Sequence, residues 1–217
     1  MSTPPFSPVA WDLEPGRTAL VLIDPQNDFL HPDGWYAQRN VDIAHMRRVI
    51  EPIKALVSEA RQRDVPVIWT RHGFRDPADG GWIVSLRPFL QEGGLREDTW
   101  GYEILAELDP REGDRVVAKN RLSAFFQTNL ELLLHAANAL TVIFAGVLTN
   151  QCVAATTKDA MFRDFKPIVV EEATGTTLPH LHGPALEMMQ VGWAEVRSLS
   201  DTLTALRELA PAQAAVA

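Results

Sequence analysis

The chain has 217 residues, of which 46% are hydrophobic, and this length suits one sizeable α/β domain with a buried core. Its 20 Lys and Arg residues are outnumbered by 28 Asp and Glu residues, and the net charge of -8 argues against a basic surface for nucleic acid or an anionic membrane. No apolar run reaches transmembrane length, and the N-terminal stretch lacks the pattern of a signal peptide. We therefore expect a cytoplasmic protein without nucleic acid or membrane partners.

Six apolar runs predict strands. The first, T-A-L-V-L-I-D at residues 18–24, is aliphatic and β-branched throughout, which is typical of a strand buried on both faces of a parallel sheet. The other five predicted strands cover residues 65–70, 115–119, 140–146, 167–170 and 194–197.

Helical patterns lie between these runs. Apolar residues at three- and four-residue steps predict one long amphipathic helix over residues 41–63, with a possible kink at Pro52. The alternation of strands and helices indicates a single-domain, three-layer αβα sandwich with a mostly parallel six-stranded sheet of the Rossmann-like kind. Further helices are predicted at residues 128–137, 150–163, 182–191 and 201–209.

One segment, residues 72–101, breaks this rhythm. It is rich in Gly, Pro, Trp and Arg and shows no clear period. Long irregular loops in compact domains are often functional, so we expect this segment to contact substrate or a neighbouring subunit.

Three reactive side chains follow predicted strands: Asp24, Lys119 and Cys152, the last being the only cysteine. In an open parallel sheet ligands bind outside the carboxyl ends of the strands, so the three residues are expected at one edge. Each also has an ordinary structural explanation, since a lone Cys is often core packing and an Asp after a strand is often a turn residue. Their joint occurrence favours a catalytic site.

The position of Cys152 predicts nucleophilic chemistry. A helix should begin there, and its dipole together with Lys119 would favour the thiolate. Asp24 could then exchange the thiol proton, and the backbone amides of Leu148 and Cys152 could hold an oxyanion. Such a site performs acyl transfer.

Three segments closely resemble the signature regions of the isochorismatase-like cysteine hydrolases: L-I-D-P-Q-N-D-F, V-V-A-K-N-R-L-S-A-F-F-Q-T-N-L and F-A-G-V-L-T-N-Q-C-V-A-A-T-T-K-D-A. The resemblance covers residues 18–209 and leaves a lead-in at 1–17 and a tail at 210–217. It implies that Asp24, Lys119 and Cys152 form a catalytic triad. It also implies a cis peptide between Val147 and Leu148, and a homodimer or homotetramer.

The resemblance also bears on the substrate. Nicotinamidases of this family carry Asp-x-His after the second strand to bind a metal, whereas this chain has Thr70 before His72, so no metal is expected. The nucleophilic Cys152 argues against an isochorismate-like ether substrate. No G-x-G-x-x-G follows the first strand, so no cofactor is expected. The remaining branch hydrolyses small ureido, N-carbamoyl and related amide compounds, releasing ammonia or an amine through a thioester.

The segment K-N-R-L-S-A-F-F resembles that of ureidoacrylate hydrolases, although Asn120 and Leu122 depart from it. A substrate carboxylate could pair with an arginine, either Arg121, Arg87 or Arg75. Aromatic residues that could wall the pocket include Trp35 and Tyr36. The residues expected to bind substrate are Gln26, Phe29, His72, Trp82, Arg121 and Phe125.

Two other kinds of function remain open at this point. A phosphatase with Asp24 as nucleophile would need a second acid two residues later, where this chain has Gln26. A binding or assembly domain with a purely structural Cys152 is the non-enzymatic alternative.

Overall fold

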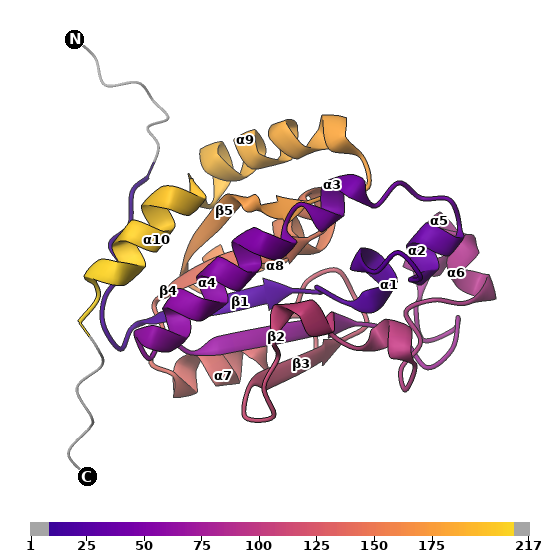
Figure 1. Ribbon diagram of the computed structural model, residues 1–217, viewed down its shortest axis with the longest axis horizontal. Helices are drawn as coiled ribbons and strands as arrows, with labels where there is room; N and C mark the ends of the chain where they lie inside the picture. The colour runs from indigo at the N-terminus through magenta and orange to yellow at the C-terminus, as the bar shows by residue number, and fades with distance from the viewer. Residues whose placement is uncertain (1–8, 211–217) are drawn as a thin grey trace.

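The computed structural model describes residues 9–210, which form a six-stranded sheet in the order β3-β2-β1-β4-β5-β6 (Figure 1). All five strand pairings are parallel. The predicted αβα fold is therefore confirmed. The strands are β1 Thr18–Ile23, β2 Val67–His72, β3 Arg115–Lys119, β4 Thr141–Val147, β5 Lys166–Gly175 and β6 Glu195–Arg197.

The two central strands are the most apolar. Every residue of β1 and of β4 is buried, as their sequences without any charged residue predict. Among the strands, the largest difference from the sequence prediction is at β5, which continues to Gly175 instead of ending at Val170. Glu171 and Glu172 interrupt its apolar run, but the strand continues past them and pairs again with β4 after a register shift.

Ten α-helices and four other helical turns connect the strands within the described part of the chain. The α-helices are α1 Asn27–Leu30, α2 Trp35–Gln38, α3 Ala44–Arg47, α4 Ile50–Gln62, α5 Trp82–Leu86, α6 Phe89–Glu92, α7 Leu130–Ala136, α8 Ala154–Met161, α9 His182–Gly192 and α10 Leu199–Glu208. The turns are η1 Trp100–Tyr102, η2 Ala106–Leu108, the π-helical η3 Thr149–Val153 and η4 Pro179–Leu181.

Helices cover both faces of the sheet (Figure 1). On one face, Leu20 and Leu22 of β1 pack in a core with residues of α3, α4 and α10, including Ile53. On the other face, Val21 of β1 packs with residues of α7, α8 and α9, including Leu134. Successive side chains of β1 thus point to opposite cores, which is why residues 19–23 of the strand are all apolar.

The prediction of one long helix over residues 41–63 is wrong. The segment forms two helices, α3 and α4, which are separated at Arg48 and Val49. Pro52 lies in the first turn of α4, where its missing N–H costs no helical hydrogen bond. In a continuous helix its ring would instead meet the carbonyl of Arg48, so the break precedes the proline and replaces a kink.

Segment 73–101 is irregular but well anchored. Leu90 and Leu95 are buried in the core beside α4. The Asp28 carboxylate accepts hydrogen bonds from the backbone N–H groups of Leu95 at 2.6 Å and Trp35 at 3.0 Å. The segment therefore forms a fixed cover over the ends of β1 and β2.

Gly146 allows the closest approach between the two central strands. Its φ of 117° lies in the region that favours glycine, and a Cβ there would lie 2.1 Å from the carbonyl oxygen of Ile23. This contact holds the end of β4 against the end of β1, which brings the residues that follow each strand together.

In residues 9–210 no helix combines the length and the hydropathy that a membrane span requires. Residues 1–8 of the predicted lead-in and residues 211–217 of the predicted tail lie outside the described part of the chain, so these two boundaries stay predictions.

Candidate active site

Four chemically reactive residues meet at the carboxyl edge of the sheet. Asp24 follows β1, His72 ends β2, Lys119 ends β3, and Cys152 lies in η3, after β4. His72 and Lys119 are direct neighbours in the β2–β3 register. The strand order 3-2-1-4 thus collects residues that are up to 128 positions apart in the sequence.

Asp24 is completely buried and held by three interactions with two groups, the Thr70 hydroxyl and the Lys119 ammonium. Its backbone N–H donates to the Thr70 hydroxyl at 3.0 Å, and that hydroxyl donates to Oδ1 of the carboxylate at 2.5 Å. Nζ of Lys119 lies 2.7 Å from Oδ2. Asp24 has a φ of 49°, a left-handed conformation that turns the chain sharply at the strand end and is frequent at functional sites.

Lys119 is equally enclosed. Its ammonium donates to the carbonyl oxygens of Arg121 at 3.0 Å and Leu122 at 3.1 Å, besides its ion pair with Asp24. Burial alone lowers the pKa of Lys119, but the neighbouring Asp24 and Cys152 outweigh burial and raise it above the ordinary lysine value. Lys119 therefore remains a cation at neutral pH.

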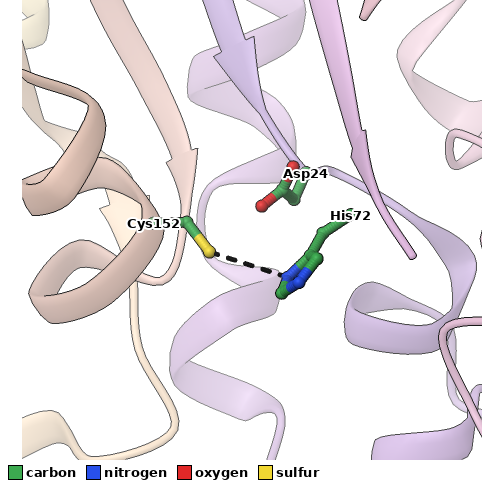
Figure 2. Close-up of side chains that lie close together, drawn as sticks. All are labelled: Asp24, His72 and Cys152. Carbon is green, nitrogen blue, oxygen red and sulfur yellow. Dashed lines mark hydrogen bonds between the residues drawn. The ribbon is translucent and has the colours of Figure 1, made fainter. Parts of the chain in front are cut away.

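Cys152 faces Asp24 and His72 across the end of the sheet (Figure 2). Its Sγ lies 3.9 Å from Nδ1 of His72, and the ligand atoms of the three residues are all within 4.8 Å of one another. Burial raises the pKa of the Cys152 thiol to about 12; Lys119 acts in the opposite direction, and Asp24 adds to the increase.

This pKa differs from the sequence expectation of a stabilised thiolate. The sequence places Cys152 at a helix N-terminus, whereas in the structure it is the fourth residue of a π-helical turn that precedes α8. Only 3% of Cys152 is exposed, so desolvation outweighs the nearby ammonium. The thiol therefore rests in its protonated form.

We expect alkylation of Cys152 by iodoacetamide to rise about tenfold per pH unit between pH 8 and pH 10. The reactive species is the thiolate, whose fraction grows with pH until the pH reaches the thiol pKa, here about 12. The measurement is the alkylation rate by mass spectrometry, with circular dichroism confirming the fold at each pH. A plateau below pH 8 would contradict the protonated resting state.

The turn that carries Cys152 begins with the cis peptide between Val147 and Leu148, as the family resemblance implies. The Leu148 carbonyl accepts hydrogen bonds from the N–H groups of Gln151 at 3.0 Å and Val153 at 3.2 Å. The N–H of Cys152 lies between these two donors in the sequence.

A cluster of polar side chains contacts the first two residues of the η3 turn, Thr149 and Asn150. Thr149 Oγ1 lies 3.0 Å from Nδ1 of His182 at the start of α9. Asn150 accepts a hydrogen bond from the Thr176 hydroxyl at 2.7 Å, beyond the end of β5. Burial lowers the pKa of His182 to about 4, so the ring is neutral at physiological pH. The C-terminal third of the chain thus fixes the turn.

A tight pocket lies beside Cys152, and its cavity volume is only about 10 Å³. This is far below the ~300–1,000 Å³ of pockets that hold drug-sized ligands, so the pocket suits only a small molecule, and its side chains must move to admit one. Its wall is mostly apolar, with polar groups from His72, Arg87 and Gln151. The complete lining is Phe29, Tyr36, His72, Ile83, Arg87, Leu90, Leu95, Leu122, Leu148, Gln151 and Cys152.

Two of the six residues expected to bind substrate, Phe29 and His72, line this pocket. Gln26 lies behind it, where its amide group is used by the backbone. Nε2 of Gln26 donates to the carbonyls of His72 at 3.1 Å and Tyr102 at 3.0 Å, and its Oε1 accepts from the His72 N–H at 2.7 Å. Gln26 therefore positions the end of β2.

The other three lie outside the pocket lining. Trp82 is 84% exposed and lies in a separate surface depression with Arg121. The Arg121 guanidinium donates to the backbone carbonyls of Asp79 and Asn120. Phe125 is buried in the second core, where its ring stacks on Phe165 at 6.0 Å. Their predicted contact with substrate has no support from this geometry.

Sequence reasoning missed two contributors to the site. Thr70 was considered only as a missing metal ligand, yet its hydroxyl holds the Asp24 carboxylate. Gln151 was quoted only within a motif, yet its amide lines the pocket and accepts a hydrogen bond from Arg87. Its position directly before Cys152 was the signal that could have indicated it.

The same cluster contains potential metal ligands. Asp24, His72 and Cys152 each offer one atom, all buried. The carboxylate already has an ammonium at 2.7 Å, and a divalent cation would meet the charge of Lys119 at short range. The donor set therefore fits a proton-transfer site better than a metal site.

A family profile and two curated relatives match most of this chain. The family profile described as the Isochorismatase domain matches residues 18–201. A curated ureidoacrylate amidohydrolase, RutB of Klebsiella pneumoniae, is 31% identical to this chain. The alignment is 236 residues long with its gaps and covers 98% of each chain. A RutB from Klebsiella variicola is 33% identical over 199 residues, or 85% of this chain and 82% of the relative.

Solved structures show the same fold. A cysteine hydrolase from Pseudomonas syringae pv. phaseolicola has a TM-score of 0.85 and 26% identity, covering 96% of this chain and 100% of that one. An N-carbamoylsarcosine amidase from Thermoplasma acidophilum has a TM-score of 0.70 and 25% identity, covering 84% and 96% respectively.

Proposed function

This chain belongs to the isochorismatase family of hydrolases, and we propose that it is a cysteine amidohydrolase that cleaves a C–N bond in small ureido or N-carbamoyl compounds. The observation that carries this proposal is the buried group of Asp24, Lys119 and Cys152 beside a small pocket. The names of the curated relatives, which are ureidoacrylate amidohydrolases, support the substrate class.

The first step joins proton transfer to nucleophilic attack. Because the Cys152 thiol rests protonated, its proton passes to the Asp24 carboxylate as Sγ bonds to the carbonyl carbon of the substrate. Lys119 remains a cation throughout and stabilises the negative charge that moves between sulfur and carboxylate. Burial strengthens this electrostatic effect, since water is largely absent from the three groups.

The tetrahedral intermediate carries an oxyanion. We assign its stabilisation to the backbone N–H groups of Leu148 and Cys152 in the turn that Thr149 and His182 fix. Donors held in place before the reaction need no reorganisation as the charge develops.

Collapse of the intermediate breaks the C–N bond. Protonated Asp24 donates its proton to the departing nitrogen, which leaves as ammonia or an amine, and the acyl group remains on Sγ as a thioester. Water then attacks this thioester while Asp24 accepts the water proton. The C–S bond breaks, and Sγ recovers a proton from Asp24.

His72 is placed to orient the substrate. Burial lowers the pKa of His72 well below its ordinary value, with Lys119 and Arg87 adding to this effect, so the ring is neutral. Its Nε2 is buried without a hydrogen-bond partner among residues 9–210. A substrate amide that hydrogen bonds to this atom would relieve an unfavourable buried polar group.

The proposal is tested by ammonia release from a panel of substrates. We expect release from ureido acids, N-carbamoyl amino acids or biuret, and none from nicotinamide, whose metal motif this chain lacks. The Cys152→Ala variant, which has no nucleophile, is the control and should release nothing. Undiminished release by this variant would overturn the cysteine mechanism, and release from nicotinamide alone would overturn the substrate class.

We further propose that the enzyme works in the cytoplasm as a homodimer or homotetramer. Trp82 and Leu86, on one short helix, are 84% and 79% exposed, and large apolar side chains at such a site are frequent in subunit contacts. Light scattering of the purified protein tests the oligomeric state.

A further inference from the structure

Arg87 differs from most arginines of this chain in having no acidic partner within residues 9–210. Its side chain donates a hydrogen bond to Oε1 of Gln151. Most other arginines form ion pairs; Arg61, for example, pairs with Asp109 at 2.9 Å and Asp114 at 2.6 Å. Arg96 and Arg121 also lack a carboxylate partner there, but of these three only Arg87 lines the pocket beside Cys152.

The rest of the pocket does not compensate this charge. Lys119 is neutralised by Asp24 at 2.7 Å, and His72 is neutral because burial lowers its pKa. No Asp or Glu belongs to the pocket lining that the structure describes. The pocket beside Cys152 therefore carries one net positive charge in an apolar surrounding.

The charge of Arg87 acts across the pocket. Burial raises the pKa of the Tyr36 hydroxyl, and Arg87 is the largest influence that opposes this increase. Tyr36 also lines the pocket, and its ring centroid lies 4.7 Å from that of Phe29. A negative group entering this space would be attracted strongly, since the apolar walls screen little.

The position of Arg87 matches a short substrate. Gln151, which it contacts, is the residue directly before the nucleophile Cys152. A molecule attacked by Sγ therefore needs only a few bonds between its reacting carbon and a group at Arg87. The tight pocket, with a cavity volume of about 10 Å³, also favours a short molecule.

We propose that Arg87 binds the carboxylate of the substrate, and that the enzyme therefore acts on small ureido or N-carbamoyl acids and discriminates against neutral ureas. This inference rests on the proposed function. The carboxylate would replace the Gln151 amide oxygen, and a guanidinium can hold it through two parallel hydrogen bonds. The two other arginines considered from the sequence do not line the pocket: Arg121 binds backbone carbonyls, and Arg75 pairs with Asp79.

The test compares two substrates of similar size, 3-ureidopropionate and the neutral 3-ureidopropan-1-ol. We expect the wild-type enzyme to prefer the acid in kcat/KM. Arg87→Gln should reduce this preference about 10- to 100-fold, mainly through a higher KM for the acid, with the alcohol unaffected. Arg87→Lys keeps the positive charge but loses the paired N–H donors of the guanidinium. Its preference for the acid should lie between those of the wild type and Arg87→Gln.

The control is Arg111→Gln, which removes the same charge from an exposed loop where the side chain is 62% exposed. It should retain the wild-type preference. Equal kcat/KM for acid and alcohol in the wild type, or an unchanged preference in Arg87→Gln, would overturn the assignment of Arg87.

Calorimetry separates this failure from failure of the proposed function. Binding of 3-ureidopropionate is measured in Cys152→Ala and in Cys152→Ala/Arg87→Gln, where no turnover occurs. A loss of affinity in the second variant supports the role of Arg87. Equal affinity in both overturns it, even if the wild type hydrolyses ureido compounds. Hydrolysis of no ureido compound by the wild type would overturn the proposed function itself.

Discussion

Asp24→Asn is expected to reduce kcat/KM on the order of 10³-fold, because an amide cannot accept the Cys152 proton or return it to the leaving nitrogen. The same carboxylate takes part in two proton transfers, one from Cys152 and one to the leaving nitrogen. The loss of kcat/KM should therefore be larger than for a residue that only orients the substrate. The measurement is steady-state ammonia release on the substrate that the panel identifies.

Alkylation distinguishes this loss from a damaged fold. The Asp24 carboxylate raises the pKa of Cys152, so its removal should increase the rate of alkylation at pH 8 while turnover falls. Thr70→Val is the matched control. It removes the hydroxyl that donates to Oδ1 but keeps the carboxylate, so its loss of activity should be much smaller. Equal losses in both variants would indicate a purely structural role for Asp24.

Lys119→Met is expected to lower the free energy of unfolding by about 3 to 5 kcal/mol, because it leaves a completely buried carboxylate without its counter-ion. Turnover should be lost as well. The measurement is denaturant unfolding together with kcat/KM. The double variant Asp24→Asn/Lys119→Met removes both charges and should recover much of the stability, though none of the activity.

Lys54→Met provides the control for this pair. Lys54 and Glu51 also lie 2.8 Å apart, but both side chains are exposed, so the substitution should leave stability unchanged within error. If Lys119→Met were as stable as the wild type, the buried pair would not contribute to stability as its geometry indicates.

The sequence predicted the sheet and the grouping of Asp24, Lys119 and Cys152 because both depend on local signals. Six apolar runs were sufficient to identify the strands, and a parallel sheet necessarily brings their carboxyl ends to one edge. Asp24, Lys119 and Cys152 follow three of these runs, and so they were recognisable without any knowledge of distances.

The pocket beside Cys152 was harder to predict because it depends on packing. Trp82 and Phe125 are aromatic, as pocket residues often are. Trp82 lies at the surface, however, and Phe125 lies in the core. Segment 73–101 has no period, so the sequence could not indicate which of its side chains face Cys152. Only the folded segment shows that Arg87, and not Arg121, reaches the pocket.

The protonation of Cys152 could not be predicted for a related reason. The sequence shows which charges are near in the chain, but the pKa depends first on burial, which is a property of the fold. The same holds for His72, whose neutrality follows from its enclosure.

The order of the strands has a consequence for synthesis of the protein. The central strand β1 pairs with β2 on one side and with β4 on the other, and β4 ends at Val147. While the ribosome produces the first 140 residues, one edge of β1, T-A-L-V-L-I, has no partner. Such an apolar edge readily pairs with other chains, so a nascent or truncated chain that ends before β4 should aggregate.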